Sequence, residues 1–304
     1  MDDPAAHSGR GIVVLAGEFL ADIGYRRYSP RTLEIYRLGL TDFARFLAAG
    51  GIREAREVTA PRIEAYRRHL RQRGFSPAGE ETYLHGVKRF FGFLEDTQRV
   101  FENPFAGLGP VRRERKLMPV PTEAEMQALL AAPNVATARG VRTRAILEVA
   151  YSTGARLEEL ARMRHSDLDL ANGAVRILGK GNRERMAPLG AAAIEWVRKY
   201  VVEVRARQTR TAGGALWVKA LGLPLGSVMI GRLIRECARR AGTVTPITPH
   251  GIRRACATHM LNRGAHPVQL QMLLGHTSLK HLSQYLRVSF RELRAIHERS
   301  RLGA

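Results

Sequence analysis

Cysteine is almost absent from this chain of 304 residues, which contains only two. Cys237 and Cys256 lack the spacing of metal ligands and make no disulfide framework, so we expect small buried side chains. Long apolar runs are missing as well, because none approaches the roughly 20 residues that a membrane span needs. The longest early run, residues 11–20, contains Glu18 and is a poor signal peptide. These absences predict a soluble, cytoplasmic protein with no membrane partner.

Lysine is scarce too, although the chain is strongly basic. Lysines and arginines number 49 against 28 acids, which gives a net charge of +21, and only six of the basic residues are lysines. Such an excess needs an anionic partner, and a nucleic-acid backbone is the usual one. Codon bias in a GC-rich genome explains the preference for arginine over lysine, but it does not explain the sign of the net charge.

Periodic apolar residues predict four amphipathic helices in the first third of the chain, which begin near Ile12, Pro30, Pro61 and Pro77. We expect their aromatic stripes to form a core and not a base-stacking platform. The opposite faces of the third and fourth helices are basic. These faces could be merely solvated, but their number favours a DNA-facing surface. The candidate DNA-binding residues there are Arg62, Arg67, Arg68, Lys88 and Arg89.

A segment rich in proline, glycine and arginine interrupts the helical pattern at residues 103–117. We predict a basic linker that lies along phosphates through Arg112, Arg113, Arg115 and Lys116. The chain is thus expected to consist of a helical domain (1–102), this linker (103–117) and a second domain (118–304). Thr122 and Glu125 form a capping box at the start of the second domain. The second domain is predicted to contain a β-hairpin at 174–189 and helices near 123–132, 138–152, 157–164, 191–207, 226–241, 250–263, 267–274 and 289–299.

Cleavage of a phosphodiester without a metal requires positive charge at the non-bridging oxygens, a base for the nucleophile and an acid for the leaving oxygen. Arginines, histidines, a lysine and a hydroxyl group can supply all of these, whereas metal nucleases use clustered acids. The acids of this chain do not cluster convincingly. Asp167 and Asp169 are expected to be turn and capping residues. The sequence therefore predicts neither a metal nor a cofactor.

Six side chains of the required types lie in short segments, and each segment alone is weak evidence: Arg156, Lys180, His250, Arg253, His276 and Tyr285. Arg156 stands at the start of a helix, where arginine is common. Lys180, at the tip of a glycine-rich hairpin, could be solvated or could bind phosphate. His250 and Arg253 lie three residues apart on a helix, so one anion could touch both. The plain alternative for Tyr285 is a partly buried aromatic side chain.

Taken in order, the segments resemble the tyrosine recombinase (phage integrase) family, and most closely its Xer-like bacterial branch. The matching boxes are YSTGARLEEL, GKGNRERMAPLG, PHGIRRACATHMLNRGA and QMLLGHTSLKHLSQY, and SPRTLEIYRLGLTDFARFL is similar to the family's core-binding domain. The resemblance is strong over residues 122–290 and moderate over 12–100. It implies a mainly α protein with two domains: an N-terminal four-helix, SAM-like core-binding bundle and a mostly helical catalytic domain with a small β-sheet.

The resemblance also implies a role for each matching residue. Arg156 and Arg253 match the two arginines that hold the scissile phosphate, and Glu159 matches an acidic position that supports the site. Lys180 matches the proton donor to the leaving 5′ oxygen. Tyr285 matches the nucleophile that forms a 3′-phosphotyrosyl link, which stores the energy of the broken bond. Two histidines are expected to bond the phosphate, and the first can also act as a base: His250 and His276.

The expected activity is site-specific recombination of double-stranded DNA by four protomers, either all of this chain or shared with a second recombinase. Resolution of replicon dimers and movement of a mobile element both remain open. Arg254 and the pair His281-Leu282 depart from the family pattern, which weakens assignment to the housekeeping Xer pair and favours a mobile element. The alternatives are an inactive DNA-binding accessory factor, a type IB topoisomerase-like enzyme that relaxes DNA, and a metal-dependent nuclease.

Overall fold

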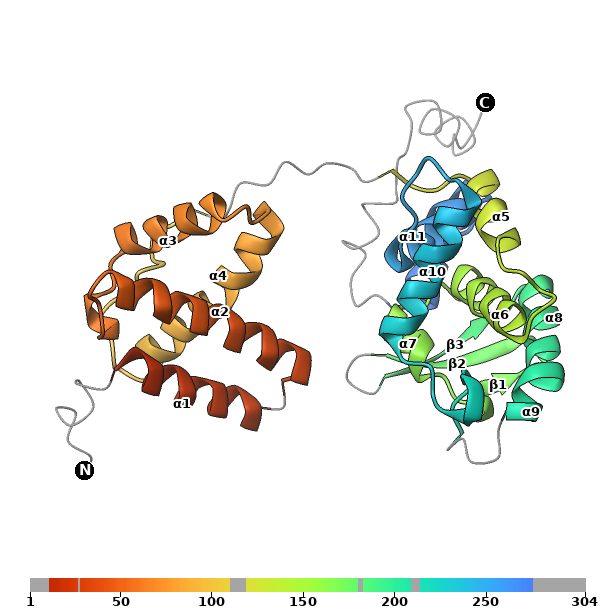
Figure 1. The fold of residues 1–304 in the computed structure, drawn as a ribbon, viewed down its shortest axis with the longest axis horizontal. Coiled ribbons are helices and arrows are strands. Elements are labelled where there is room, and N and C mark those ends of the chain that lie inside the picture. The colour runs from red at the N-terminus through yellow and green to blue at the C-terminus, as the bar shows by residue number, and fades with distance from the viewer. Residues whose placement is uncertain (1–10, 27, 110–118, 180–182, 209–213, 276–304) are drawn as a thin grey trace, which may run out of the picture. The chain divides into compact units, whose positions relative to one another are not determined.

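The computed structural model describes residues 11–26, 28–109, 119–179, 183–208 and 214–275. The chain divides into two compact units, Met1–Lys116 and Leu117–Ala304. Helices make up most of both units, and the strands of the described part form one small sheet in the second (Figure 1). The predicted fold class is therefore confirmed. The helix predicted at 289–299 lies outside the described residues.

The first unit is the predicted bundle of four helices: α1 (Ile12–Tyr25), α2 (Pro30–Ala49), α3 (Ala60–Gln72) and α4 (Pro77–Asp96). Ser29 and Ser76 accept hydrogen bonds from the first turns of α2 and α4, and a proline follows each serine. The aromatic side chains pack in the interior, as predicted, with Phe43, Phe90 and Phe91 fully buried.

The second unit packs its helices around one hydrophobic core. The helices are α5 (Glu123–Ala131), α6 (Ala138–Thr153), α7 (Leu157–Arg162), α8 (Ala191–Lys199), α9 (Ala206–Gln208), α10 (Ser227–Ala241), α11 (Pro249–Asn262) and α12 (Pro267–Leu274). A π-helical stretch, Tyr200–Arg205, joins α8 to α9. Helix α6 is buried on nearly every side because α5, α8 and α11 pack against it. Cys237 and Cys256 are buried free thiols, as expected.

The sheet has the order β1-β2-β3 and is antiparallel throughout, with β1 (Leu168–Asp169), β2 (Ala174–Leu178) and β3 (Glu184–Pro188). Strands β2 and β3 are the predicted hairpin, whereas the two-residue β1 was not predicted. Val175 pairs with Ala187 and Ile177 pairs with Arg185. Since alternate residues share a face, these four side chains belong to the inward face of the sheet.

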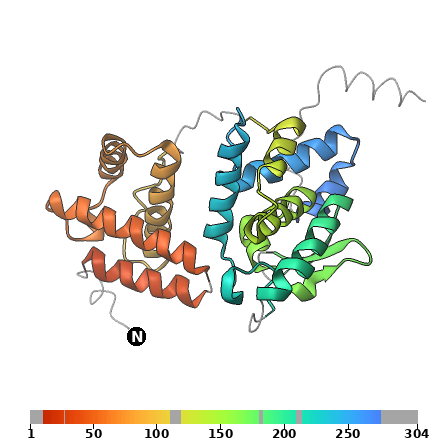
Figure 2. The same cartoon turned by 45° about the vertical axis from the view of Figure 1, so that its right-hand side comes forward.

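The hairpin lies beside α7 and α12, and α12 also packs against α11 (Figures 1 and 2). Segments far apart in the sequence therefore meet here: the start of α7, the strands β2 and β3, and the end of α12. In the described residues, no helix has both the length and the apolar character that crossing a membrane requires.

Candidate active site

The turn between α6 and α7 is built around Gly154. This glycine ends α6 in the left-handed region, with φ of 59°, a conformation that a side chain disfavours. There is also no room for one, because a Cβ atom would lie 2.6 Å from Leu274 Cδ2 and 3.3 Å from Cys256 Sγ. The tight turn leaves Arg156 as the residue that precedes α7, two residues after the glycine.

Glu159 collects three hydrogen bonds at the start of α7. It accepts from the backbone N–H of Arg156 (3.0 Å), from Arg156 Nη1 (2.7 Å) and from Arg185 Nη2 on β3 (2.7 Å). The Glu159 side chain is only 5% exposed, whereas that of Arg156 is 45% exposed. The buried carboxylate therefore holds Arg156 from the protein side and leaves part of the Arg156 side chain open to solvent.

Helix α11 contributes the H-x-x-R pair. Thr248 caps this helix by accepting from the N–H of Gly251 (3.0 Å). This local hydrogen bond fixes the first turn of α11, which contains His250. His250 is exposed, and Arg253 is 3% exposed. Arg253 donates to the carbonyls of Gly154 and Leu274, both at 2.7 Å. It therefore fastens α11 to the α6–α7 turn and to the end of α12.

The electrostatics place these residues in one neighbourhood. Although His250 is exposed overall, partial desolvation of its imidazole lowers its pKa below the ordinary value, and the charges of Arg254, Arg253 and Arg156 lower it further. Burial alone raises the pKa of Glu159, but the hydrogen bonds from Arg185 and Arg156 outweigh burial and leave the pKa lowered. Near pH 7 the site accordingly combines a neutral imidazole, an ionised carboxylate and several guanidiniums. Such a site attracts an anion and can accept a proton.

Four of the seven expected catalytic and supporting residues are thus described, and the structure brings them together: Arg156, Glu159, His250 and Arg253. Lys180, His276 and Tyr285 lie outside the described residues. The residues that precede two of them are described. Gly179 directly precedes Lys180, and Gly275, which follows α12, directly precedes His276. Cβ atoms added at Gly179 and Gly275 would lie 3.7 Å and 3.1 Å from Arg185 Nη1. The residues that directly precede Lys180 and His276 in the chain therefore both lie close to the Arg185 guanidinium.

Arg185 is the site residue that the sequence did not reveal. Besides its contact with Glu159, it donates from Nε to the carbonyl of Leu273 at 2.7 Å. The available signal was an arginine at a position where strand alternation demands an apolar side chain, two residues before the buried Ala187. This signal is weak in a chain that contains so many arginines.

The expected DNA-binding residues of the first unit divide into two groups. Arg68, Lys88 and Arg89 are exposed and Arg62 is partly exposed, which suits a surface that meets phosphates. Arg67 differs from the expectation because it is buried. It donates from Nε to Glu80 (3.0 Å) and from Nη1 to Glu64 (2.5 Å). Two acids therefore neutralise the Arg67 guanidinium inside the bundle. The linker residues Arg112, Arg113, Arg115 and Lys116 lie outside the described residues.

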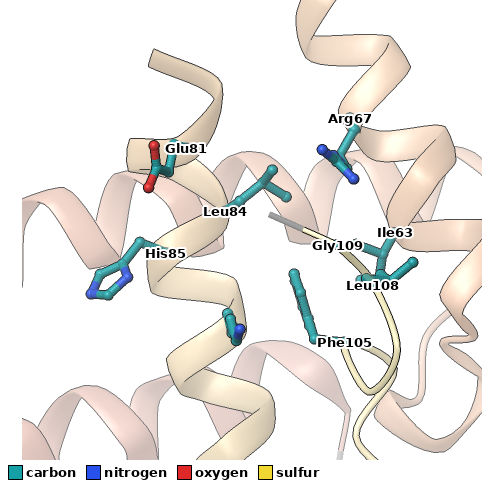
Figure 3. A pocket seen from close by; sticks show the side chains of 9 residues that line it. Ile63, Arg67, Glu81, Leu84, His85, Phe105, Leu108 and Gly109 are labelled. Atoms are coloured by element: carbon teal, nitrogen blue, oxygen red, sulfur yellow. The ribbon is translucent and has the colours of Figure 1, made fainter. Parts of the chain in front are cut away.

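A cleft of about 180 Å³ opens between α3, α4 and residues 105–109 of the first unit (Figure 3). Its lining is mostly apolar, from Ile63, Leu84, Phe105 and Leu108, with charged groups at its rim. It contains none of the expected catalytic residues.

The acids near the site have structural roles. Asp167 accepts from the N–H of Arg164 and from Arg176, and Asp169 accepts from the N–H of Asn172. Asp167 thus caps the 3-10 helix His165–Asp167, and Asp169, at the end of β1, holds the turn that follows, which are the turn and capping roles that the sequence predicted. Within the described ranges there is no group of three or more histidines, cysteines, aspartates or glutamates that could hold a metal ion.

Comparison with known proteins gives matches along most of the chain. The phage integrase family matches residues 120–292, and the phage integrase N-terminal SAM-like domain matches residues 17–100. Tyrosine recombinase XerD of Shewanella oneidensis is 32% identical over 93% of this chain and 95% of its own length. Tyrosine recombinase XerC of Bacillus pumilus is 30% identical over 88% of this chain and 90% of its own length.

Two solved structures share the fold at low sequence identity. The Tn1549 transposon integrase in complex with a circular intermediate DNA is 20% identical, with a TM-score of 0.73 over 96% of this chain and 99% of that one. A lambda integrase tetramer bound to a Holliday junction is 17% identical, with a TM-score of 0.71 over 90% of this chain and 80% of that one.

Proposed function

This chain belongs to the phage integrase family of tyrosine recombinases, and on that premise we propose that it is a site-specific DNA recombinase of the Xer type. The observation that carries the proposal is the cluster of Arg156, Glu159, His250 and Arg253, where the start of α7 and the first turn of α11 meet in a basic site. Its substrate is a double-stranded recombination site. We propose that four protomers act together, either all of this chain or paired with a second recombinase, in the cytoplasm.

In the proposed reaction, the Tyr285 hydroxyl attacks the scissile phosphorus. A bond forms between the tyrosine oxygen and phosphorus, and the bond to the 5′ oxygen breaks. His250 is neutral near pH 7, so it can accept the tyrosine proton, and Lys180 gives a proton to the departing 5′ oxygen. Arg156, Arg253 and His276 bear the charge that develops on the non-bridging oxygens. The 5′ hydroxyl of a partner strand then attacks the phosphotyrosine and reverses the same steps without ATP.

Each unit has a part in this proposal. We assign residues 1–102 to core binding, 103–117 to a basic linker along phosphates and 118–304 to catalysis. Resolution of replicon dimers is the biological role that we propose. The relatives at 30–34% identity along most of both chains are Xer recombinases, whereas the transposon and lambda integrases resemble this chain in fold at 20% identity or less.

The test is covalent capture of DNA. The full chain is incubated with sheared genomic DNA of the organism that encodes it, denatured in SDS, and the DNA that remains linked to protein is sequenced. We expect the wild type to enrich one site. Tyr285→Phe should bind that site but capture none of it, because it lacks the attacking oxygen. Tyr25→Phe is the matched control, since Tyr25 is 90% exposed in the first unit, and it should capture DNA normally.

The alternatives predict other results. Capture by Tyr285→Phe at the wild-type level would exclude Tyr285 as the nucleophile. An accessory factor captures nothing in any form. A type IB topoisomerase relaxes supercoiled plasmids that lack the enriched site. A recombinase of the kind proposed leaves those plasmids unchanged.

A further inference from the structure

Arg185 is a charged residue on the inward face of the sheet. Its cross-strand partner is Ile177, and the neighbouring inward pair, Val175 and Ala187, is fully buried. The Arg185 side chain is itself only 12% exposed. A buried guanidinium is strongly unfavourable unless every face of it is matched by hydrogen-bond acceptors and counter-charge. The inward face of the strand would favour an apolar side chain at this position, so the reason for an arginine must lie in its hydrogen-bond partners.

Those partners belong to two other elements of the candidate site. Arg185 Nη2 donates to Glu159 Oε2, the carboxylate whose other oxygen holds Arg156. Arg185 Nε donates to the carbonyl of Leu273, in the last turn of α12 and three residues before His276. The planar guanidinium thus bridges α7 and α12. Arg185 itself lies on β3, the strand that follows Lys180 in the hairpin.

The glycines that flank this guanidinium show how closely the three segments meet. Gly179 is the last described residue before Lys180. A Cβ atom there would lie 3.7 Å from Glu159 Oε1 as well as from Arg185 Nη1. Gly179 N–H also bonds to the carbonyl of Arg183 at 2.8 Å, which closes the base of the hairpin. The base of the hairpin is therefore held against the Arg185–Glu159 ion pair.

We propose that Arg185 is a positioning residue for strand cleavage, which fixes the base of the Lys180 hairpin against α7 and the end of α12. The proposal rests on the proposed function, because that function gives Lys180 its role as the acid. Arg185 acts through its contacts and not by touching the phosphate. Its loss should therefore impair the proton transfer to the leaving oxygen more than it impairs DNA binding.

The test compares two forms of a nicked duplex that carries the site enriched by covalent capture. One has an ordinary scissile phosphodiester and the other a 5′-bridging phosphorothiolate, whose thiolate leaves without a proton. We expect Arg185→Gln to slow single-turnover cleavage of the ordinary duplex by about 100-fold, since a displacement near 1 Å costs about that much. The phosphorothiolate should restore about tenfold or more of this loss. DNA affinity should stay within about threefold of the wild type, because no phosphate contact is removed.

Arg176→Gln is the matched control. Arg176 lies on β2 of the same sheet, its side chain is 45% exposed, and it pairs with Asp167 and Glu184 instead of Glu159. Its substitution should leave cleavage of both duplexes unchanged. Arg185→Lys is the second variant, for use if Arg185→Gln does not fold. It keeps the charge but cannot reach Glu159 and Leu273 together, so we expect an intermediate loss with the same sulfur rescue.

Two results would overturn the inference. One is cleavage by the Arg185 variants at the wild-type rate. The other is an equal loss on both duplexes, which would mean that Arg185 supports the fold or the arginines and not the acid. Lys180→Ala, measured in parallel, separates this failure from failure of the proposed function. If sulfur rescues Lys180→Ala but not the Arg185 variants, only the inference fails. If sulfur does not rescue Lys180→Ala, the proposed acid is wrong and the inference falls with it.

Discussion

Replacement of Gly154 by alanine tests whether the α6–α7 turn is as tightly constrained as the geometry indicates. Gly154 has φ of 59° and faces Leu274 and Cys256, whereas Gly242 ends α10 with φ of 60° and has no atom within 4 Å of an added Cβ. The two glycines share the same backbone conformation and the same place at a helix end. Gly242→Ala is therefore a control that reports the cost of the left-handed conformation alone.

The expected magnitudes follow from these two environments. A left-handed residue with a side chain costs about 1–2 kcal/mol, which both variants should lose. Crowding adds to this at Gly154, where the Cβ would lie 2.6 Å from Leu274 Cδ2. The clash is with the end of a side chain, but that side chain is fully buried, so its displacement should cost about 1–3 kcal/mol more. For a unit of this size the difference corresponds to a melting temperature lower by about 2–12 °C.

The assay is calorimetric unfolding of the full chain, combined with single-turnover cleavage of the captured site. Gly154→Ala should melt below Gly242→Ala. It should also cleave more slowly, because the carbonyl of Gly154 holds Arg253 Nη1 at 2.7 Å. Gly242→Ala should cleave at the wild-type rate. Equal melting temperatures for the two variants would refute the argument that Leu274 and Cys256 leave no room for a side chain.

Two further predictions concern pH. The pKa of His250 is lowered by desolvation and by three nearby arginines, so the cleavage rate should fall only as the pH drops below the ordinary histidine value of 6.5, where the base becomes protonated. His250→Gln should be slower at neutral pH and lack this fall, while His85→Gln on α4 keeps it; identical profiles for all three would exclude His250 as the base. The backbone N–H groups of Thr122 and Thr245 lower the pKa of Glu125 to about 2, so its contribution to stability is complete above its ordinary pKa of 4.5 and is lost as the pH falls towards 2. The free energy of unfolding, measured with urea between pH 2.5 and 7, should fall less with acid for Glu125→Gln than for Glu195→Gln on the surface of α8. An equal fall in both variants would contradict the capping role.

Much of the fold could be predicted because its signals are local. Ser29-Pro30 and the Thr122–Glu125 box mark helix starts through side chains that satisfy backbone N–H groups, and both caps are present. Alternation around a glycine-rich turn predicted β2 and β3. Strand β1 has only two residues, Leu168 and Asp169. It could not be predicted, because two residues carry no periodicity and its pairing depends on β2.

The site was predicted from residue types in matching boxes, which identify its members but not their partners. Helical spacing places Arg67 beside the apolar stripe of α3, four residues after Ile63, and turns Arg68 away from it. What the spacing does not reveal is the partner that makes a buried guanidinium tolerable, which is Glu80 on α4, 1% exposed and bound by Arg67 and Arg71. Pairings across 13 residues of chain and two helices depend on packing, which the sequence pattern of one helix does not record.

Arg185 and Arg253 bind neighbouring carbonyls at the end of α12. A helix leaves its last carbonyls without partners, and its C-terminal end attracts positive charge. Arg185 donates to the carbonyl of Leu273 and Arg253 donates to that of Leu274, so side chains from β3 and α11 bind consecutive residues of α12. Removing Arg253 must therefore release the end of α12 as well as any contact with phosphate. The effect of Arg253→Ala on cleavage will include both losses. The Arg185 variants remove a contact to the end of α12 but none to phosphate, so they show how much of the effect comes from the packing of α12 and its neighbours.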